Sequence, residues 1–265
     1  MSTKEHKFRG IVIREEAMGD KDKRLILLTE EMGRITVLAK GALQPNSKTS
    51  AITQLLCCGD YVLTKGKTFW YIKEAQLAES FYFIRQDLHR LGYATCMVEA
   101  AELFSVEGQE NRYLIRHLLR GLMALKEEEG RACARVADAF LFRVLAENGY
   151  YPELTLCRGC GRSLQELEEN ESVRFDFSIG SLYCQRCGAG GIRLHKGALH
   201  ALRYFLEIPA PRLYAFKVEE QVLEEMHRAV CGYLIEQTEK RYRGLEFIEG
   251  LPELPELSDI KEGSD

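Results

Sequence analysis

The sequence lacks several of the patterns that assign a function quickly. It contains no apolar run approaching the roughly 18 residues of a membrane-spanning helix. Its opening residues, MSTKEHKFRG, are polar and charged, unlike a signal peptide. Proline is scarce, with 6 residues among 265, and 29% of the residues are charged, which argues against extended disorder. We therefore expect a cytoplasmic protein of two or three folded domains without a membrane segment.

Local catalytic motifs are also missing. The glycine patterns that cradle nucleotide phosphates, GxGxxG and GxxxxGK followed by Ser or Thr, do not occur. Neither do the hydrolase patterns GxSxG and HExxH. The 6 histidines are scattered, and His195 and His200 are five positions apart, so they do not share a helix face. No local signal supports an enzyme, and the prediction is a protein without catalytic activity.

What the sequence does contain is 9 cysteines, four of which form two matching pairs. Cys157 and Cys160 lie in TLCRGCGRS, and Cys184 and Cys187 lie in LYCQRCGAG. A tetrahedral zinc ion takes four thiolates, and each C-x2-C turn supplies two from one side. A glycine follows each pair, where the backbone often needs a positive φ. The 23 residues between the pairs exceed the usual spacing of about 15 to 20. They include VRFDFSIGSLYC, whose alternation predicts a β-hairpin that delivers the second pair.

Three other roles for the cysteines compete with zinc binding. A thioredoxin-type redox motif has one such pair at the start of a helix, whereas neither pair here opens a periodic helix. Disulfides are uncommon in a reducing cytosol, and the odd number of cysteines also argues against them. The third role, a small buried apolar side chain, fits the other five: Cys57, Cys58, Cys96, Cys133 and Cys231. The four paired cysteines predict one structural Zn2+ per chain, in a closed site without a position for water.

Residues 1–80 have the pattern of a small β-barrel. Short runs alternate apolar and polar residues, as in KFRGIVIRE. In RLILLTEEMGRITVLAK two runs meet where Gly33 can adopt a positive φ. Two further runs flank Lys65-Gly66-Lys67. About five short strands without an intervening helix predict a small closed barrel, of which the OB-fold is one option.

The period becomes helical near residue 86. Asn111 is placed to cap a helix, Gly149 to end another, and a last helix is expected over residues 218–243 with Gly244 after it. The predicted fold class is α+β and multidomain. Its parts are an N-terminal OB-fold β-barrel (1–80), a helical domain (81–152 and 196–248), an inserted four-cysteine zinc lobe (153–195), and a poorly ordered acidic tail (249–265).

The N-terminal part of the chain also differs in net charge from the chain as a whole. The net charge of −4 does not suggest a nucleic-acid-binding protein, yet residues 1–80 hold 13 Lys and Arg against 10 Asp and Glu. Single-stranded nucleic acid binds cationic side chains along its backbone and aromatic rings under its bases. The run Phe69-Trp70-Tyr71 supplies aromatic rings. In a strand Phe69 and Tyr71 point to one face and Trp70 to the other, and one of these faces must be core. The candidate DNA-binding cations are Arg14, Arg24, Arg34, Lys40, Lys48, Lys65 and Lys67.

Four segments occur in a characteristic order: GIVIREEAMGDKDKRLILLTEEMGRITVLAKGA, SFYFIRQDLHRLGYATCMVEAAELF, NGYYPELTLCRGCG and FDFSIGSLYC. In this order they resemble the RecO family of bacterial recombination mediators, over nearly the whole chain. The resemblance implies an N-terminal OB-fold, a helical domain and, in many members, a four-cysteine zinc site. The family motif maps onto Gly33, Arg34, Ala39, Lys40 and Gly41. The following segment, residues 42–48, is less basic here than it often is in the family.

The resemblance also implies a function. RecO-like proteins bind single- and double-stranded DNA, anneal complementary strands, and act with RecR and in many bacteria with RecF. They help RecA to load onto DNA coated by the single-stranded-DNA-binding protein SSB, whose acidic C-terminal tail they contact. A protein of this kind is associated with the nucleoid. Two alternatives stay open: a zinc-stabilised OB-fold adaptor that binds proteins rather than DNA, and a zinc-dependent or redox enzyme.

Overall fold

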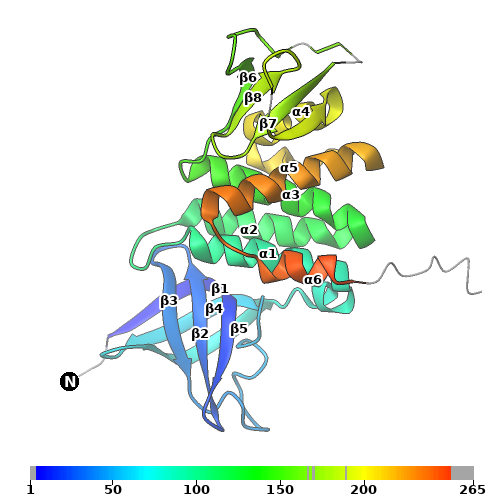
Figure 1. Cartoon of the computed structure of the whole chain (residues 1–265). Coiled ribbons are helices and arrows are strands. Elements are labelled where there is room, and N and C mark those ends of the chain that lie inside the picture. The colour runs from blue at the N-terminus through cyan, green and yellow to red at the C-terminus, as the bar shows by residue number, and fades with distance from the viewer. Residues whose placement is uncertain (1–3, 166, 169–170, 189, 252–265) are drawn as a thin grey trace, which may run out of the picture.

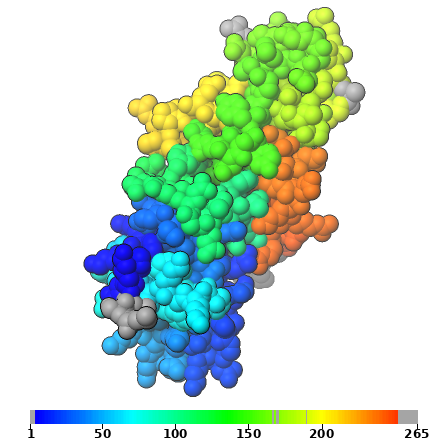
Figure 2. Space-filling view, turned by 90° about the vertical axis from the view of Figure 1, so that its left-hand side faces the viewer, coloured from blue at the N-terminus to red at the C-terminus, as the bar shows by residue number. Residues whose placement is uncertain are grey.

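Three parts follow one another along the molecule in a computed structural model, which describes residues 4–165, 167–168, 171–188 and 190–251. A β-barrel lies at one end, a body of helices in the middle, and a small sheet-containing lobe at the other end (Figure 1). The space-filling view from the side shows the same order (Figure 2). Of the predicted tail, residues 252–265 lie outside the described residues, and Glu249 is the last residue of a helix.

The barrel confirms the predicted OB-like architecture. Its strands close in the order β1-β2-β3-β5-β4. Neighbouring strands are antiparallel except for β3 and β5, which run parallel. The strands are β1 (Glu5–Met18), β2 (Asp22–Thr29), β3 (Gly33–Ala39), β4 (Cys58–Lys65) and β5 (Trp70–Glu79).

Alternating apolar residues fill the barrel interior, as the period-2 pattern predicts. Val12, Leu25, Leu27 and Val37 are completely buried there. Gly33 has the expected positive φ, +57°, at the start of β3. A Cβ at this position would lie 2.2 Å from the Val106 carbonyl oxygen, so the glycine also lets the loop after α1 pack against the barrel.

The helical body is built around a central helix, α3. Every α3 residue from Cys133 to Ala146 is buried. Asn111 caps α2 as predicted, because its side chain accepts a hydrogen bond from the Leu114 amide. Within the described ranges, no helix combines the length and apolarity that crossing a membrane requires. The α-helices are α1 (Leu88–Leu103), α2 (Arg112–Ala124), α3 (Cys133–Glu147), α4 (Lys196–Glu207), α5 (Glu220–Thr238) and α6 (Arg243–Glu249).

The prediction of one final helix over residues 218–243 is wrong. Helix α5 ends at Thr238 because Glu239 adopts a left-handed conformation with φ +50°, and α6 begins at Arg243. Gly244 lies inside α6 rather than after a helix. A Cβ there would come within 2.4 Å of the Gly92 carbonyl oxygen, so the glycine permits close packing of α6 on α1.

The lobe contains a four-stranded sheet of order β6-β8-β7-β9. The predicted hairpin is present, since β7 and β8 are antiparallel. One sheet face, with Phe175, Leu182 and Leu194, is buried in the same core as the helices. The lobe therefore packs directly against the helical body. Its strands are β6 (Glu153–Cys157), β7 (Ser172–Asp176), β8 (Ser181–Cys184) and β9 (Ile192–His195).

The barrel is attached to the body through its outer wall. Ile11, Ile13 and Leu28 point away from the barrel interior and belong to the core cluster of the helical body. At the edge of this contact Arg14 forms an ion pair of 2.7 Å with Glu102 of α1. Apolar burial and an ion pair together fix the barrel against the helices.

Candidate metal centre and nucleic-acid interface

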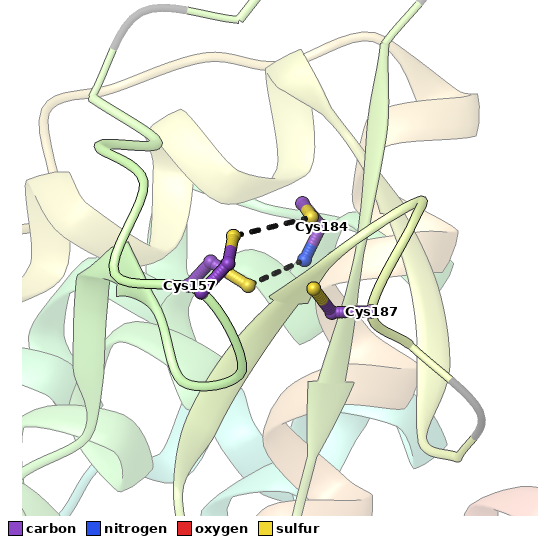
Figure 3. A group of neighbouring side chains, drawn as sticks. Cys157, Cys184 and Cys187 are labelled. Atoms are coloured by element: carbon purple, nitrogen blue, oxygen red, sulfur yellow. Dashed lines mark hydrogen bonds between the residues drawn. The ribbon is translucent and has the colours of Figure 1, made fainter.

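The four paired cysteines meet in the lobe. Cys157 ends β6 and Cys184 ends β8, while Cys160 and Cys187 follow in the turns. The four sulfur atoms lie within 4.8 Å of one another, and Cys160 Sγ is 3.9 Å from Cys184 Sγ. Figure 3 shows the side chains of Cys157, Cys184 and Cys187 converging on one point. The sequence pattern therefore identified a real cluster of thiols.

Each pair sits on a tight turn. The Gly161 amide donates to the Cys157 carbonyl at 2.8 Å, and the Gly188 amide donates to the Cys184 carbonyl at 2.9 Å. Gly161 has the expected positive φ, +72°, whereas Gly188 does not. The glycine between the first two cysteines matters as well, because a Cβ on Gly159 would lie 2.8 Å from Cys187 Cβ. Glycines thus let the two turns approach closely.

Backbone amides favour the thiolate of Cys157. The side chain is buried, which disfavours the charged form, but N–H groups of Cys184, Cys160 and Gly159 point at the sulfur. The amide of Cys184 donates to it at 3.2 Å. These donors prevail over burial and lower the pKa of Cys157 to about 6. Hydrogen bonds with the sulfurs of Cys184 and Cys160 instead raise the pKa of Cys187 to about 12. Thiolates are the form in which cysteine binds metal, so a cation is what would hold all four sulfurs in that form.

A second group of residues, on the barrel, brings exposed cations next to an aromatic ring. Lys40 follows β3 and Lys65 ends β4, on either side of the start of β5. Lys40 Nζ is 5.1 Å from the centre of the Tyr71 ring, and Lys67 is exposed in the β4–β5 turn. We call Lys40, Lys65, Lys67 and Tyr71 the barrel-end cluster. In the OB-fold, the β4–β5 loop is one of the elements that contact oligonucleotides.

Trp70 and Tyr71 of the aromatic run differ in burial, as expected for neighbouring residues of a strand. Trp70 is 7% exposed and packs edge-on against Phe8 and His6, with ring centres 5.3 Å apart in both contacts. Lys65 Nζ lies 5.6 Å from the Trp70 ring. Tyr71 is only half-buried. Tyr71 is therefore the more exposed of the two rings, and Trp70 is core.

The seven predicted DNA-binding cations are all exposed, but they are not equally free. Arg14 is bound to Glu102, and Arg34 donates to the Glu102 carbonyl at 3.4 Å. Arg24 donates to Glu16 on β1 at 3.0 Å. In the described part of the chain, no carboxylate forms an ion pair with the remaining four, which are Lys40, Lys48, Lys65 and Lys67. Within the described residues the charges of these four lysines are therefore not neutralised by an ion pair. Arg14 and Arg34, in contrast, contact Glu102 where the barrel meets the helices.

Sequence reasoning missed two groups of residues. Lys73 is exposed on β5 two residues beyond Tyr71, and strand position alone could have indicated it. The other group concerns Cys231. Four of the five cysteines predicted to be buried are buried, but Cys231 is half-buried and contacts His227, which lies beside Asp138 of α3. The spacing of His227 and Cys231, one helical turn apart, was the available signal.

The comparisons with known proteins agree with this architecture. Family models described as Recombination protein O N terminal and Recombination protein O C terminal match residues 1–81 and 85–246. A curated protein of Acetivibrio thermocellus named DNA repair protein RecO is 34% identical over 92% of this chain and 96% of its own length. Proteins of the same name from Symbiobacterium thermophilum and Alkaliphilus metalliredigens are 33% and 29% identical, over 91% and 86% of this chain. Two family models cover almost the whole folded part, and the relatives match along nearly their full lengths. The chain belongs to the RecO family.

Proposed function

We propose that this chain is a recombination mediator in DNA repair that binds single- and double-stranded DNA without catalysing a covalent reaction. The observation that carries the proposal is the barrel-end cluster, where exposed lysines that no carboxylate of the described residues pairs with stand beside a half-buried tyrosine on an OB-like barrel. Its relatives bear the name DNA repair protein RecO, which supports a role in the same process.

Strand annealing is the activity that this surface suits. Two complementary strands repel each other through their phosphates, and fixed ammonium groups lower that repulsion. A tyrosine ring offers a sequence-independent surface on which a base can stack. The barrel holds both groups on short, hydrogen-bonded strands, so little order has to be created on binding. No bond has to form or break, in keeping with a protein that acts without catalytic residues.

The four-cysteine cluster is proposed to hold one Zn2+ per chain. Cys157, Cys160, Cys184 and Cys187 would occupy all four positions of a tetrahedral ion, which leaves none for substrate or water. Zinc would join the end of β6 to the end of β8 and so hold the two cysteine turns of the lobe together. Its contribution is structural, because a closed tetrathiolate site stabilises a fold and does not activate water.

We further propose that RecR and the acidic C-terminal tail of SSB are partners, with RecA loading as the outcome and RecF acting in addition. Helix α2 exposes three arginines at helical spacing, Arg112, Arg116 and Arg120, on the helical body. Arg112 and Arg116 pair with Glu30 at 3.5 and 3.1 Å, so an acidic tail bound here would have to take the place of that carboxylate. Docking on the tail would raise the local concentration of the barrel at coated DNA. Annealing and displacement of the coat would then follow from one binding event.

Charge reversal on the barrel tests the proposal. In the variant Lys40→Glu with Lys65→Glu we expect single-stranded DNA binding to weaken at least tenfold, measured by fluorescence anisotropy of a labelled oligonucleotide at several salt concentrations. The wild-type affinity is expected to fall as salt rises, and the variant is expected to show a shallower dependence. Lys217→Glu on the helical body is the matched control and is expected to bind normally.

The same experiment separates the mediator from a protein-binding adaptor. If the double variant binds DNA with unchanged affinity and salt dependence but no longer binds RecR or the SSB tail, the barrel is a protein-binding module and the proposal is wrong. Loss of DNA binding with retention of both protein contacts supports the mediator.

A further inference from the structure

A second group of potential metal ligands lies in the helical body, away from the four paired cysteines. Asp138 is on α3, and His227 and Cys231 are one turn apart on α5. His227 Nδ1 is 2.8 Å from Asp138 Oδ1 and 3.5 Å from Cys231 Sγ. One ligand atom from each residue lies within 4.8 Å of the others. Two helices that pack together thus present an oxygen, a nitrogen and a sulfur donor to one point.

The contacts with protein atoms leave part of this group unsatisfied. Asp138 is completely buried, and among the described residues its Oδ2 atom has no hydrogen-bond partner. A buried carboxylate oxygen without a partner is costly, and such atoms are rare in folded proteins. The hydrogen bond with His227 satisfies only Oδ1. A cation between the three side chains would satisfy Oδ2 as well if the carboxylate bound it through both oxygens.

The geometry is close to that of a bound ion. With metal–ligand bonds of roughly 2.0 to 2.3 Å, tetrahedral donors lie about 3.2 to 3.8 Å apart. The separation of 3.5 Å between His227 Nδ1 and Cys231 Sγ falls in this range. The 2.8 Å contact between His227 and Asp138 is a hydrogen-bond distance, and it must open by roughly half an ångström to admit the ion. That movement is small for side chains.

The surroundings suit a site that is enclosed but can be reached. The Tyr93 ring packs edge-on against the His227 ring at 5.7 Å, and Cys96 of α1 is completely buried nearby. The His227 side chain is 28% exposed, which gives an ion a path from solvent. A mixed set of imidazole, thiolate and carboxylate is characteristic of zinc and its neighbours in the first transition series, and not of Mg2+ or Ca2+.

We propose that Asp138, His227 and Cys231 form a second metal site for a divalent ion of the zinc class, with its fourth position open to water. The ion would join α3 to α5, the central helix to the helix on which the lobe rests. The competing arrangement is a metal-free ion pair between His227 and Asp138 beside a thiol. The two differ in what they require of Cys231, since the ion pair does not need it.

Metal content is the direct test, on the full chain purified without chelators. Native mass spectrometry is expected to find one bound zinc ion fewer per molecule in Cys231→Ala than in the wild type. The variant Cys133→Ala, which removes a buried cysteine outside the group, serves as the control and is expected to keep the wild-type content. Equal metal content in the wild type and Cys231→Ala overturns the proposal.

Cobalt gives a second readout in a different background. In a chain with Cys160→Ala and Cys187→Ala, where the paired cysteines no longer form a complete site, added Co2+ is expected to produce tetrahedral absorption bands with one thiolate ligand. Those bands are expected to disappear when Cys231→Ala is added. Absence of the bands in the first variant, or their persistence in the second, contradicts the assignment. Neither outcome bears on DNA binding by the barrel, so the two proposals fail separately.

Discussion

The ammonium group of Lys40 lies 5.1 Å from the centre of the Tyr71 ring, so a cation from the end of β3 covers an aromatic side chain at the start of β5. The contact joins the two groups that single-stranded nucleic acid needs, a charge for phosphate and a ring for a base. Lysine over a ring is held in place without a carboxylate, and its charge stays available to a ligand.

Removal of the Tyr71 ring should weaken DNA binding through lost stacking. We expect Tyr71→Ala to lose about 1–3 kcal/mol of binding free energy, which is the usual contribution of one stacked base. Tyr71→Phe should bind nearly as the wild type does, since the ring remains. Anisotropy with a labelled oligonucleotide measures both. Equal loss in the two variants would show that the hydroxyl group, and not the ring, makes the contact.

Removal of the proposed zinc ion should affect the lobe before the barrel. We expect a strong chelator, or Cys157→Ser, to lower the midpoint of thermal unfolding, because metal binding contributes to folding free energy. Trp70 is the single tryptophan of the chain and lies in the barrel core, so its fluorescence should change little. Circular dichroism and tryptophan fluorescence recorded together test this. Simultaneous loss of both signals would mean that barrel and lobe unfold as one unit.

Gly244→Ala should be destabilising although alanine favours helices. The added Cβ would lie 2.4 Å from the Gly92 carbonyl oxygen and 2.5 Å from the Cys96 amide nitrogen, both backbone atoms that cannot move aside easily. We expect a loss of about 1–3 kcal/mol, the usual cost of overpacking. Urea unfolding measures it. Gly250→Ala, where the nearest atom would be 3.5 Å away, should be nearly neutral.

Acid should destabilise the protein through His117. Burial, followed by Arg143 and Arg120, lowers the pKa of His117 to about 3, while an unfolded histidine titrates near 6.5. Between these values the unfolded chain binds a proton that the folded chain does not. The stability is therefore complete above pH 6.5 and declines as the pH falls toward 3, by at most about 1.4 kcal/mol per pH unit.

Replacement of His117 by phenylalanine isolates this effect. His117 stacks on Phe140 with ring centres 5.0 Å apart, so a phenyl ring preserves the stacking. Urea unfolding from pH 7 to pH 5 should then show a weaker pH dependence than in the wild type. The exposed His200 provides the control, and His200→Gln should leave the dependence unchanged. An identical pH dependence in His117→Phe would contradict the assignment.

The barrel and the thiol cluster could be predicted because their signals are local. Alternation marks which strand residues point inward, and the C-x2-C spacing marks two turns that each offer two sulfurs. The parallel pairing of β3 with β5 has no such signal, since it depends on closure of the whole sheet. The role of Arg14 was equally hidden, because its partner Glu102 is 88 positions away.

Two further differences between the predicted and observed roles have the same origin. Gly244 follows a long apolar pattern that predicts a helix end, but its small size serves the contact of α6 with the backbone of α1. Cys231 fits an apolar stripe of α5. Only the packing of α5 against α3 brings Asp138 next to His227, which lies one helical turn before Cys231. In both cases a distant segment decides what the residue does.

The seam between β3 and β5 consists of only two paired positions, Val37 with Trp70 and Leu38 with Tyr71, and is the shortest ladder of the barrel. The lysine-covered ring therefore stands where the wall is closed by the fewest hydrogen bonds. Next to this seam the indole of Trp70 is anchored by its edge-on contacts with Phe8 and His6. The shortest join in the wall is thus also the place where a lysine and a half-buried tyrosine come together.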